Sequence, residues 1–186
     1  MKKIILFCLL ILNVLFVFAQ QTDTIIKKQG KAISSPKPLM VSLSSSDQFS
    51  VLANAIKAAN LTGSFDGNSP VTLFAPTNKA FEKLAPGKLD TLLLPAHQAE
   101  LAAFIQYHAV AGRVTSKDIA KLIRAGNGKT ILTTLSGGTV TATINENRNI
   151  VLTDENGGQS IINRFDIQQS NGILNVVTTV LMPKSK

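Results

Sequence analysis

The sequence of 186 residues contains one cysteine, two histidines, one tyrosine and no tryptophan. A single cysteine excludes a framework of internal disulfides and a cysteine-rich zinc site. His97 and His108 have no neighbouring ligand at metal-binding spacing, so we expect no metal and no cofactor. With so few aromatics and no basic stripe interleaved with them, the composition also argues against nucleic-acid binding.

Motifs for catalysis are equally scarce. There is no GxSxG nucleophile elbow and no HExxH helix. The tract GNGKT at 126–130 is similar to the end of a phosphate-binding loop, but Ile123 occupies the position of the leading glycine. We therefore predict that the protein is not an enzyme and has no catalytic residue. A secreted hydrolase that uses His108 as its base is the weakest of three functional hypotheses.

The N-terminus predicts export. Two lysines precede an apolar run over residues 4–18, and the chain turns polar at Gln20, which is typical of a signal peptide spanning residues 1–19. The alternative is a membrane anchor, because the run nearly reaches the roughly 18 to 20 residues that span a bilayer. Asn13 inside the run favours cleavage. Cys8 lies within the apolar core rather than after a cleavage point, so a lipid anchor there is not expected.

The stretch after the predicted cleavage point differs from the remainder of the chain. Residues 20–46 are rich in serine, carry two prolines, and have more lysines than acids, which predicts a flexible basic tether. A tether of this sign could touch anionic polysaccharide or lipid headgroups, but we favour a solubilising spacer. Residues 47–186 then have the size of one domain.

The segment VTLFAPTNKAF at 71–81 predicts a strand that turns sharply into a helix. Phe74 belongs to a β-prone run, and Pro76 removes a backbone donor and stops the strand. Thr77 then stands where the residue capping a helix is expected, with Phe81 on the buried face of that helix.

A second informative segment, DIQQSNGILNVVTTVLMP, closes the chain at 166–183. Asn171 and Gly172 supply a turn that tolerates positive φ. Residues 173–180 follow as a mostly apolar strand, which we expect to be buried on both faces. Between the two segments, the first half of the chain has helical periodicity and the second half alternates as strands do. The expected elements are a helix behind Ser46 or Asp47, a helix over 101–108, a helix capped by Thr115 and Asp118, and strands at 139–144, 150–153 and 160–164. This order predicts an α+β domain in which helices cover a sheet or two-layered wedge.

The two segments, with the tract between them, resemble the fasciclin domain family over about residues 47–183. The residues that carry the resemblance are Phe74, Pro76, Thr77, Asn78, Phe81, Asn171 and Gly172. The resemblance implies an antiparallel β wedge or sandwich covered by several helices, in an extracellular adhesion and scaffolding module. The chain departs from the family pattern at Asn175 and Thr178, where a histidine and an aspartate are common, so no role attributed to those two positions carries over.

The resemblance also implies candidate adhesion residues. Family members that bind cell-surface receptors have Asp-Ile and Tyr-His pairs proposed as adhesion motifs, and the counterparts here are Asp166 with Ile167 and Tyr107 with His108. From the residues themselves we favour structural roles. His108 lies on the apolar face of its helix and would be satisfied by a buried backbone group, Asp166 would cap the following turn, and Ile167 would belong to the core.

These observations lead to three hypotheses of decreasing weight. The first is an exported, non-enzymatic adhesion or scaffold module that binds envelope or extracellular proteins or polysaccharide, in a bacterial periplasm or outside the cell. The second is a carrier that holds a small hydrophobic, lipid-like ligand in a cleft between helices and sheet. The third is the secreted hydrolase described above. An exposed apolar patch near Phe165 would favour adhesion, and an apolar cavity would favour the carrier. The hydrolase requires an exposed His108. We expect no membrane-spanning segment after signal cleavage.

Overall fold

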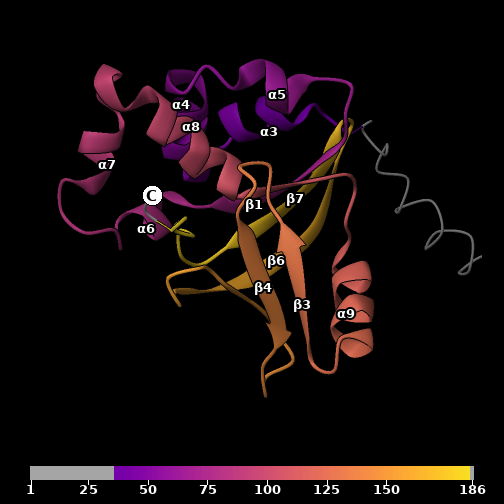
Figure 1. Cartoon of the computed structure of the whole chain (residues 1–186). Coiled ribbons are helices and arrows are strands. Elements are labelled where there is room, and N and C mark those ends of the chain that lie inside the picture. Colours follow the sequence, from indigo (N-terminus) through magenta and orange to yellow (C-terminus); the bar gives the residue numbers. More distant parts are fainter. Residues whose placement is uncertain (1–35, 185–186) are drawn as a thin grey trace, which may run out of the picture. The chain divides into compact units, whose positions relative to one another are not determined.

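The computed structural model describes residues 36–184 (Figure 1). The described residues belong to one compact unit that begins at Pro36. The signal peptide expected at 1–19 and the first part of the expected tether, 20–35, lie outside the described residues. Within residues 36–184, no helix is both long enough and apolar enough to cross a bilayer.

Helices dominate the first half of the domain and strands the second, as the sequence predicts. The helices are α3 (Leu39–Ser44), η1 (Asp47–Phe49), α4 (Ser50–Ala58), α5 (Thr62–Asp66), α6 (Asn78–Phe81), α7 (Lys88–Leu92), η2 (Pro95–His97), α8 (Gln98–Tyr107) and α9 (Ser116–Ala125). The strands are β1 (Val71–Pro76), β2 (Ala109–Ala111), β3 (Lys129–Thr133), β4 (Thr139–Ile144), β5 (Ile150–Thr153), β6 (Gln159–Gln169) and β7 (Gly172–Val177).

The seven strands follow the order β2-β1-β7-β6-β5-β4-β3. Strand β6 is shared between two parts of the sheet, because its first residues pair with β5 and the rest pairs with β7. Its register against β7 shifts twice, between Ile162 and Arg164 and again between Arg164 and Ile167. Such bulges bend a strand. In Figure 1, β6 lies between the part of the sheet that contains β1 and β7 and the part that contains β3 and β4. Beyond β3, the Leu135 N–H donates to the Ala109 carbonyl at 2.7 Å and links the two ends of the strand order.

The prediction of an antiparallel sheet is confirmed with one exception, the parallel pair formed by β1 and β7. Each of these strands is buried at all six positions. Strands buried on both faces are usual for parallel pairs, and the apolar run of β7 had predicted this burial. The pair places the two most informative sequence segments side by side as the second and third strands of the sheet.

Alternating residues of β1 enter two different hydrophobic clusters, as the two-residue period of a strand requires. Leu73 and Ala75 pack in the first cluster with α3, α4 and α8, whereas Phe74 packs in the second with residues of α9 and the β3–β5 part of the sheet. Figure 1 shows α3, α4, α5 and α8 gathered over one part of the sheet, and α9 beside β3. The helices therefore fill the open faces of the wedge.

The folded domain begins earlier than the boundary expected at residue 47. Helix α3 buries Leu39, Met40 and Leu43, whose exposed fractions are 0%, 4% and 0%. Serines and prolines in this stretch suggested a flexible tether, but the apolar residues at the i, i+1 and i+4 positions form a buried helical face. The part of the expected tether in α3 is therefore ordered and belongs to the core.

The turn before β7 also differs from expectation. Neither Asn171 nor Gly172 adopts a positive φ. A Cβ on Gly172 would lie 2.0 Å from the Val71 carbonyl oxygen, so glycine is required here by the close approach of β1. Asn171 joins distant segments instead of shaping the turn: its side chain accepts from Leu39 N at 2.9 Å and donates to Phe65 O at 2.6 Å.

The helix after β1 begins as predicted but has no side-chain cap. Thr77 occupies the N-cap position of α6 and makes no side-chain capping hydrogen bond. The neighbouring Asn78 accepts from Val51 N at 3.1 Å and donates to Asp47 O at 2.9 Å. The side chain of Asn78 thereby ties α6 to the start of α4.

Candidate functional site

Two groups of candidate residues lie in different parts of the fold, and the first comprises Tyr107 and His108 at the end of α8. His108 is fully buried, with Nδ1 2.9 Å from the Phe104 carbonyl oxygen and Nε2 accepting from Leu181 N at 2.9 Å. These partners require a proton on Nδ1 and a lone pair on Nε2, which is the neutral imidazole. Burial lowers the pKa of His108 to about 4. The prediction that His108 is buried and hydrogen-bonded to backbone groups is confirmed.

Tyr107 is buried beside it and connects two turns. Its hydroxyl donates to Thr139 O at 2.6 Å and accepts from Glu155 N at 3.1 Å. Burial raises the pKa of Tyr107 to about 12, so the hydroxyl stays protonated. A Cβ on Gly138 would lie 2.8 Å from the Tyr107 ring, which explains the glycine at that turn. Tyr107 therefore fixes the β3–β4 and β5–β6 connections against each other.

The last described residues are attached to the same cluster. The Asp154 carboxylate accepts from Met182 N at 2.9 Å, and Asn156 Nδ2 donates to Met182 O at 2.9 Å and Pro183 O at 3.1 Å. Together with the His108 contact, these bonds hold the chain end on the β5–β6 turn. The Tyr-His pair is structural and offers no surface for adhesion. Because His108 is buried with backbone partners on both ring nitrogens, the hypothesis of a hydrolase that uses it as base is wrong.

The low pKa of His108 predicts a pH-dependent stability. The unfolded chain binds a proton near pH 6.5 and the folded chain only near pH 4, so the unfolded state holds more protons between these values and stability falls as the pH falls. A shift of this size corresponds to about 3 kcal/mol at most, lost between pH 6.5 and 4. Chemical denaturation at half-unit pH steps measures it, and His108→Gln should flatten the profile in this window. A His108→Gln profile that parallels the wild type would contradict the assignment.

The second group lies at the bulge of β6 and includes Phe165, Asp166 and Ile167. Asp166 has a φ of +55°, which is unusual for a residue with a side chain. Its carboxylate accepts from Ser116 N at 2.7 Å and from the Ser116 hydroxyl, at the first turn of α9. The expectation that Asp166 caps the turn before β7 is therefore wrong: the bulge rotates its carboxylate toward α9.

The bulge is supported from beneath by Asn175. Its Oδ1 accepts from Asp166 N at 2.8 Å, which satisfies a backbone donor that the register shift releases from the ladder. Asn175 is fully buried, and its Nδ2 has no partner among residues 36–184. Ile167 is half-buried and packs against the first hydrophobic cluster, as expected for a core residue.

Phe165 is the exposed member of the group, with 38% of its surface accessible. Its neighbours Asn163 and Arg164 are exposed as well. Because Asp166 is held by α9 on one side and by β7 on the other, the backbone that carries Phe165 is fixed. The bulge surface, defined as Asn163, Arg164 and Phe165, is a rigid strip with one aromatic side chain. Among the described residues, no cluster of three or more His, Cys, Asp or Glu side chains could hold a metal ion.

A bent mixed sheet and a helical layer define the domain as an α+β wedge. The chain belongs to the fasciclin domain family, whose sequence model, described as the Fasciclin domain, matches residues 47–183. This finding and the fold confirm the resemblance stated from the two sequence segments.

Similar proteins occur in bacteria and animals. Two proteins of Synechocystis sp. are 31% and 33% identical over 137 and 148 residues, covering 74% and 78% of this chain and 68% and 98% of their own lengths. The transforming growth factor-beta-induced protein ig-h3 of Oryctolagus cuniculus is 32% identical over 76% of this chain and 18% of its own length. A solved fasciclin domain pair from the insect cell adhesion molecule Fasciclin I superposes with a TM-score of 0.70 at 19% identity, covering 80% of this chain and 51% of that one.

The sequence had no signal for the Asp166–Ser116 contact, because the two residues are 50 positions apart. One signal for the bulge was available: two consecutive polar residues, Asn163 and Arg164, interrupt the alternation of β6.

Proposed function

We propose that the protein is an exported adhesion module that binds an extracellular or envelope protein through the bulge surface around Phe165. The observation that carries this proposal is an exposed aromatic side chain on a backbone fixed by Asp166, Ser116 and Asn175. Aromatic anchors on rigid elements bind at a low entropic cost, and interfaces concentrate their energy in such residues. The exposed Asn163 and Arg164 supply the polar rim that surrounds such an anchor.

A carrier would need a cleft between helices and sheet. The interface of α4 and α8 with β7 is filled by buried residues of the first hydrophobic cluster, among them Leu52, Leu101 and Leu174, so a ligand has no room there. Export through the predicted signal peptide agrees with the adhesion role and belongs to the same proposal. No nucleic-acid partner and no cofactor are part of it.

Photo-crosslinking tests which surface binds. A photoreactive phenylalanine analogue replaces Phe165 in the exported chain, and the same analogue replaces Ile131 in a matched control. Ile131 is 64% exposed and lies on β3, so it presents an apolar side chain on a different surface. We expect a discrete protein adduct on the producing cells from position 165 and none from position 131. Adducts of equal yield from both positions would refute the bulge surface as the binding site.

The substitution Phe165→Ala measures how much the Phe165 side chain contributes to the binding free energy. Loss of a buried interface aromatic costs 2 kcal/mol or more at a hot spot, so we expect the affinity for the crosslinked partner to fall at least about tenfold. Ile131→Ala should leave affinity unchanged. Binding is measured by biolayer interferometry with the purified partner, after thermal melts show both variants folded. If the Phe165→Ala variant binds the partner with wild-type affinity, the proposal is wrong.

A further inference from the structure

Basic residues are concentrated in one part of the domain. Residues 113–153, which comprise α9 and strands β3 to β5, contain six basic and two acidic residues, whereas residues 36–112 contain five of each. Both ion pairs of the described part of the chain involve Glu100 of α8, so none of the six basic side chains is paired with a carboxylate there. The part of the domain around α9 therefore carries an unpaired positive charge.

Three of these basic residues form a stripe along α9. Lys117, Lys121 and Arg124 lie at positions i, i+4 and i+7, which share one face of a helix, and all three are exposed. The opposite face carries Ile119 and Ile123, which are 0% and 2% exposed and pack in the second hydrophobic cluster. Figure 1 shows α9 beside β3 and apart from the other helices. The basic stripe, defined as Lys117, Lys121 and Arg124, therefore faces solvent.

The other charged residues near the stripe are already engaged. Asp118 is the acidic residue of α9, and its carboxylate accepts from Thr115 N at 3.0 Å and from the Thr115 hydroxyl at 2.6 Å. Arg113, which precedes the helix, donates to Gln169 O at 2.9 Å and to Gly172 O at 2.8 Å. Asp118 thus belongs to the capping box and Arg113 to the β6–β7 turn, which leaves the stripe uniformly cationic.

The geometry of the basic stripe matches a linear polymer with regularly spaced negative charges. At the helical rise, Lys117 and Lys121 are about 6 Å apart along the axis, and Lys121 and Arg124 are about 4.5 Å apart. These steps are close to the length of one sugar in an extended polysaccharide. Arg124 adds a planar guanidinium, which binds a carboxylate through two parallel hydrogen bonds. A chain with one carboxylate per sugar therefore presents its charges in step with the stripe.

A membrane surface and a nucleic acid match α9 less well. Helices that lie in a bilayer interface bury an apolar face among the lipids. The apolar face of α9 is occupied by the domain core, and Leu122 is the one large apolar residue of this helix that is exposed, at 46%. Single-stranded nucleic acids are bound by aromatic side chains that stack on the bases, and α9 has none.

We propose that the basic stripe of α9 binds an acidic extracellular polysaccharide, a linear polymer with one carboxylate per sugar. The polymer lies along the helix, and its carboxylates accept hydrogen bonds from Lys117, Lys121 and Arg124. This inference goes beyond the proposed function, because the polysaccharide and the protein partner contact different side chains. The two surfaces adjoin, since Ser116, which binds Asp166 of the bulge, directly precedes Lys117. A domain with both surfaces links a protein to a matrix polymer.

Polygalacturonate is the probe, and its fully methyl-esterified form is the matched neutral polymer. Biolayer interferometry with the exported chain measures binding of both polymers. We expect saturable binding of polygalacturonate, none of the ester, and an affinity that falls about tenfold between about 50 and about 200 mM NaCl, because binding of a polyanion releases counterions. Absence of polygalacturonate binding, or equal binding of the ester, overturns the proposal. Tighter binding of single-stranded DNA or of phosphatidylglycerol vesicles overturns the assignment of a polysaccharide.

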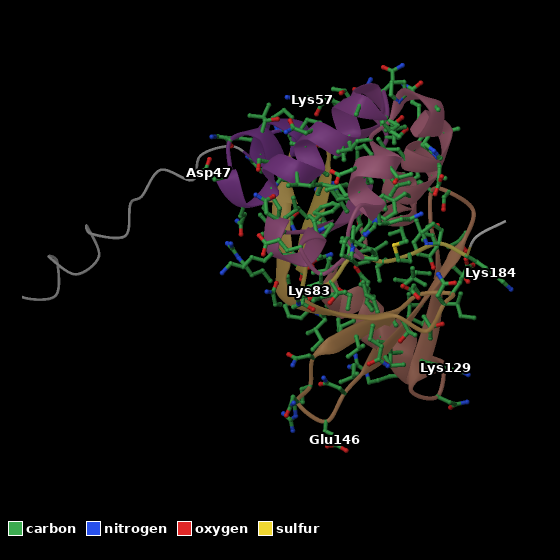
Figure 2. All side chains as sticks on the ribbon, turned by 90° about the vertical axis from the view of Figure 1, so that its left-hand side faces the viewer. Asp47, Lys57, Lys83, Lys129, Glu146 and Lys184 are labelled. Carbon is green, nitrogen blue, oxygen red and sulfur yellow. The ribbon has the colours of Figure 1, made fainter. Side chains whose placement is uncertain are left out.

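A double substitution locates the site. Lys121→Gln/Arg124→Gln removes two cations from the stripe and preserves the helix, because glutamine has nearly the same helix propensity. We expect at least about tenfold weaker polygalacturonate binding and a shallower salt dependence. The matched control Lys57→Gln/Lys79→Gln removes the same charge from α4 and α6 and should bind as the wild type. Figure 2 shows Lys57 far from Lys129, which begins β3 just after α9. Equal losses in both double variants would show that net charge alone acts, and would overturn the stripe as the site.

Two further variants separate this inference from structural effects and from the proposed function. Lys121→Arg/Arg124→Lys keeps both charges and should bind polygalacturonate as the wild type does. Phe165→Ala should also retain polygalacturonate binding, and Lys121→Gln/Arg124→Gln should retain the protein partner of the bulge surface. Loss of polygalacturonate binding in Phe165→Ala would contradict a site confined to α9. Each proposal can therefore fail without the other.

Discussion

Gly172→Ala is expected to destabilise the domain by at least about 3 kcal/mol, because the new methyl group would meet backbone rather than a movable side chain. The added Cβ lies 2.0 Å from Val71 O, and 3.1 Å from the carbonyl carbon of the same residue. Gly172 pairs with Val71 in the parallel β1–β7 ladder and with Gln169 in the antiparallel β6–β7 ladder. The clash can be relieved only by opening the centre of the sheet.

Thermal melting of Gly172→Ala gives the first measurement. A decrease of about 3 kcal/mol in the free energy of unfolding corresponds to a decrease of about 10 °C in Tm for a domain of this length. Gly63→Ala is the matched control: a Cβ there meets nothing within 4 Å, and the residue lies in α5, where alanine is favoured over glycine. The control should melt at or slightly above the wild-type temperature. A Gly172→Ala protein that melts with the wild type would show that β1 and β7 are not packed as described.

His108→Ala is expected to cost about 3 to 5 kcal/mol. The substitution leaves a cavity in the core and removes the partners of Phe104 O and Leu181 N, and each buried polar group without a partner costs about 1 to 3 kcal/mol. It also releases the chain end, since Leu181 N is one of the backbone groups that attach this segment to the domain. Stability and local order should therefore change together.

Denaturant titration measures the global effect of His108→Ala, and hydrogen exchange measures the local one. We expect faster exchange at the amides of Leu181 and Met182 than at β7, even under conditions where the variant is folded. His97→Ala serves as control because that ring is partly exposed and its hydrogen-bond partner is Glu100, away from the chain end. Wild-type exchange at Leu181 in the His108→Ala protein would contradict the tail attachment.

Features that depend on neighbouring residues were predictable. The capping box of α9 has both of its reciprocal bonds, between Thr115 and Asp118, because the two residues lie within one turn. Strand β4 runs over Thr139–Ile144 as the alternation predicted, with Val140 and Ala142 buried. Burial of His108 also followed from its place on an apolar helical face. In each case the deciding interaction lies within the element itself or follows from its periodicity.

Features that depend on distant segments were missed or misread. Helix α3 looked like tether because serines and prolines flank its short apolar stretch, and a helix of this length is stable only with the core partners supplied by α4, α5 and β7. No strand was predicted at the positions of β2 and β3, because strands of three to five residues carry little periodic signal. Asp166 was assigned to the nearest turn, whereas the register shift of β6 directs it to Ser116.

The sequence by itself determined the family, the succession of a helical first half and a β-rich second half, and the buried positions of elements such as α9 and β4, since these follow from periodicity, capping and turn residues within short windows. Only the tertiary structure decided that β1 and β7 pair in parallel, that the bulge of β6 exposes Phe165, and that the carboxylate of Asp166 reaches Ser116. Those outcomes depend on pairs of residues separated by many positions, whose contact is set by the free energy of packing the whole domain rather than by local preference.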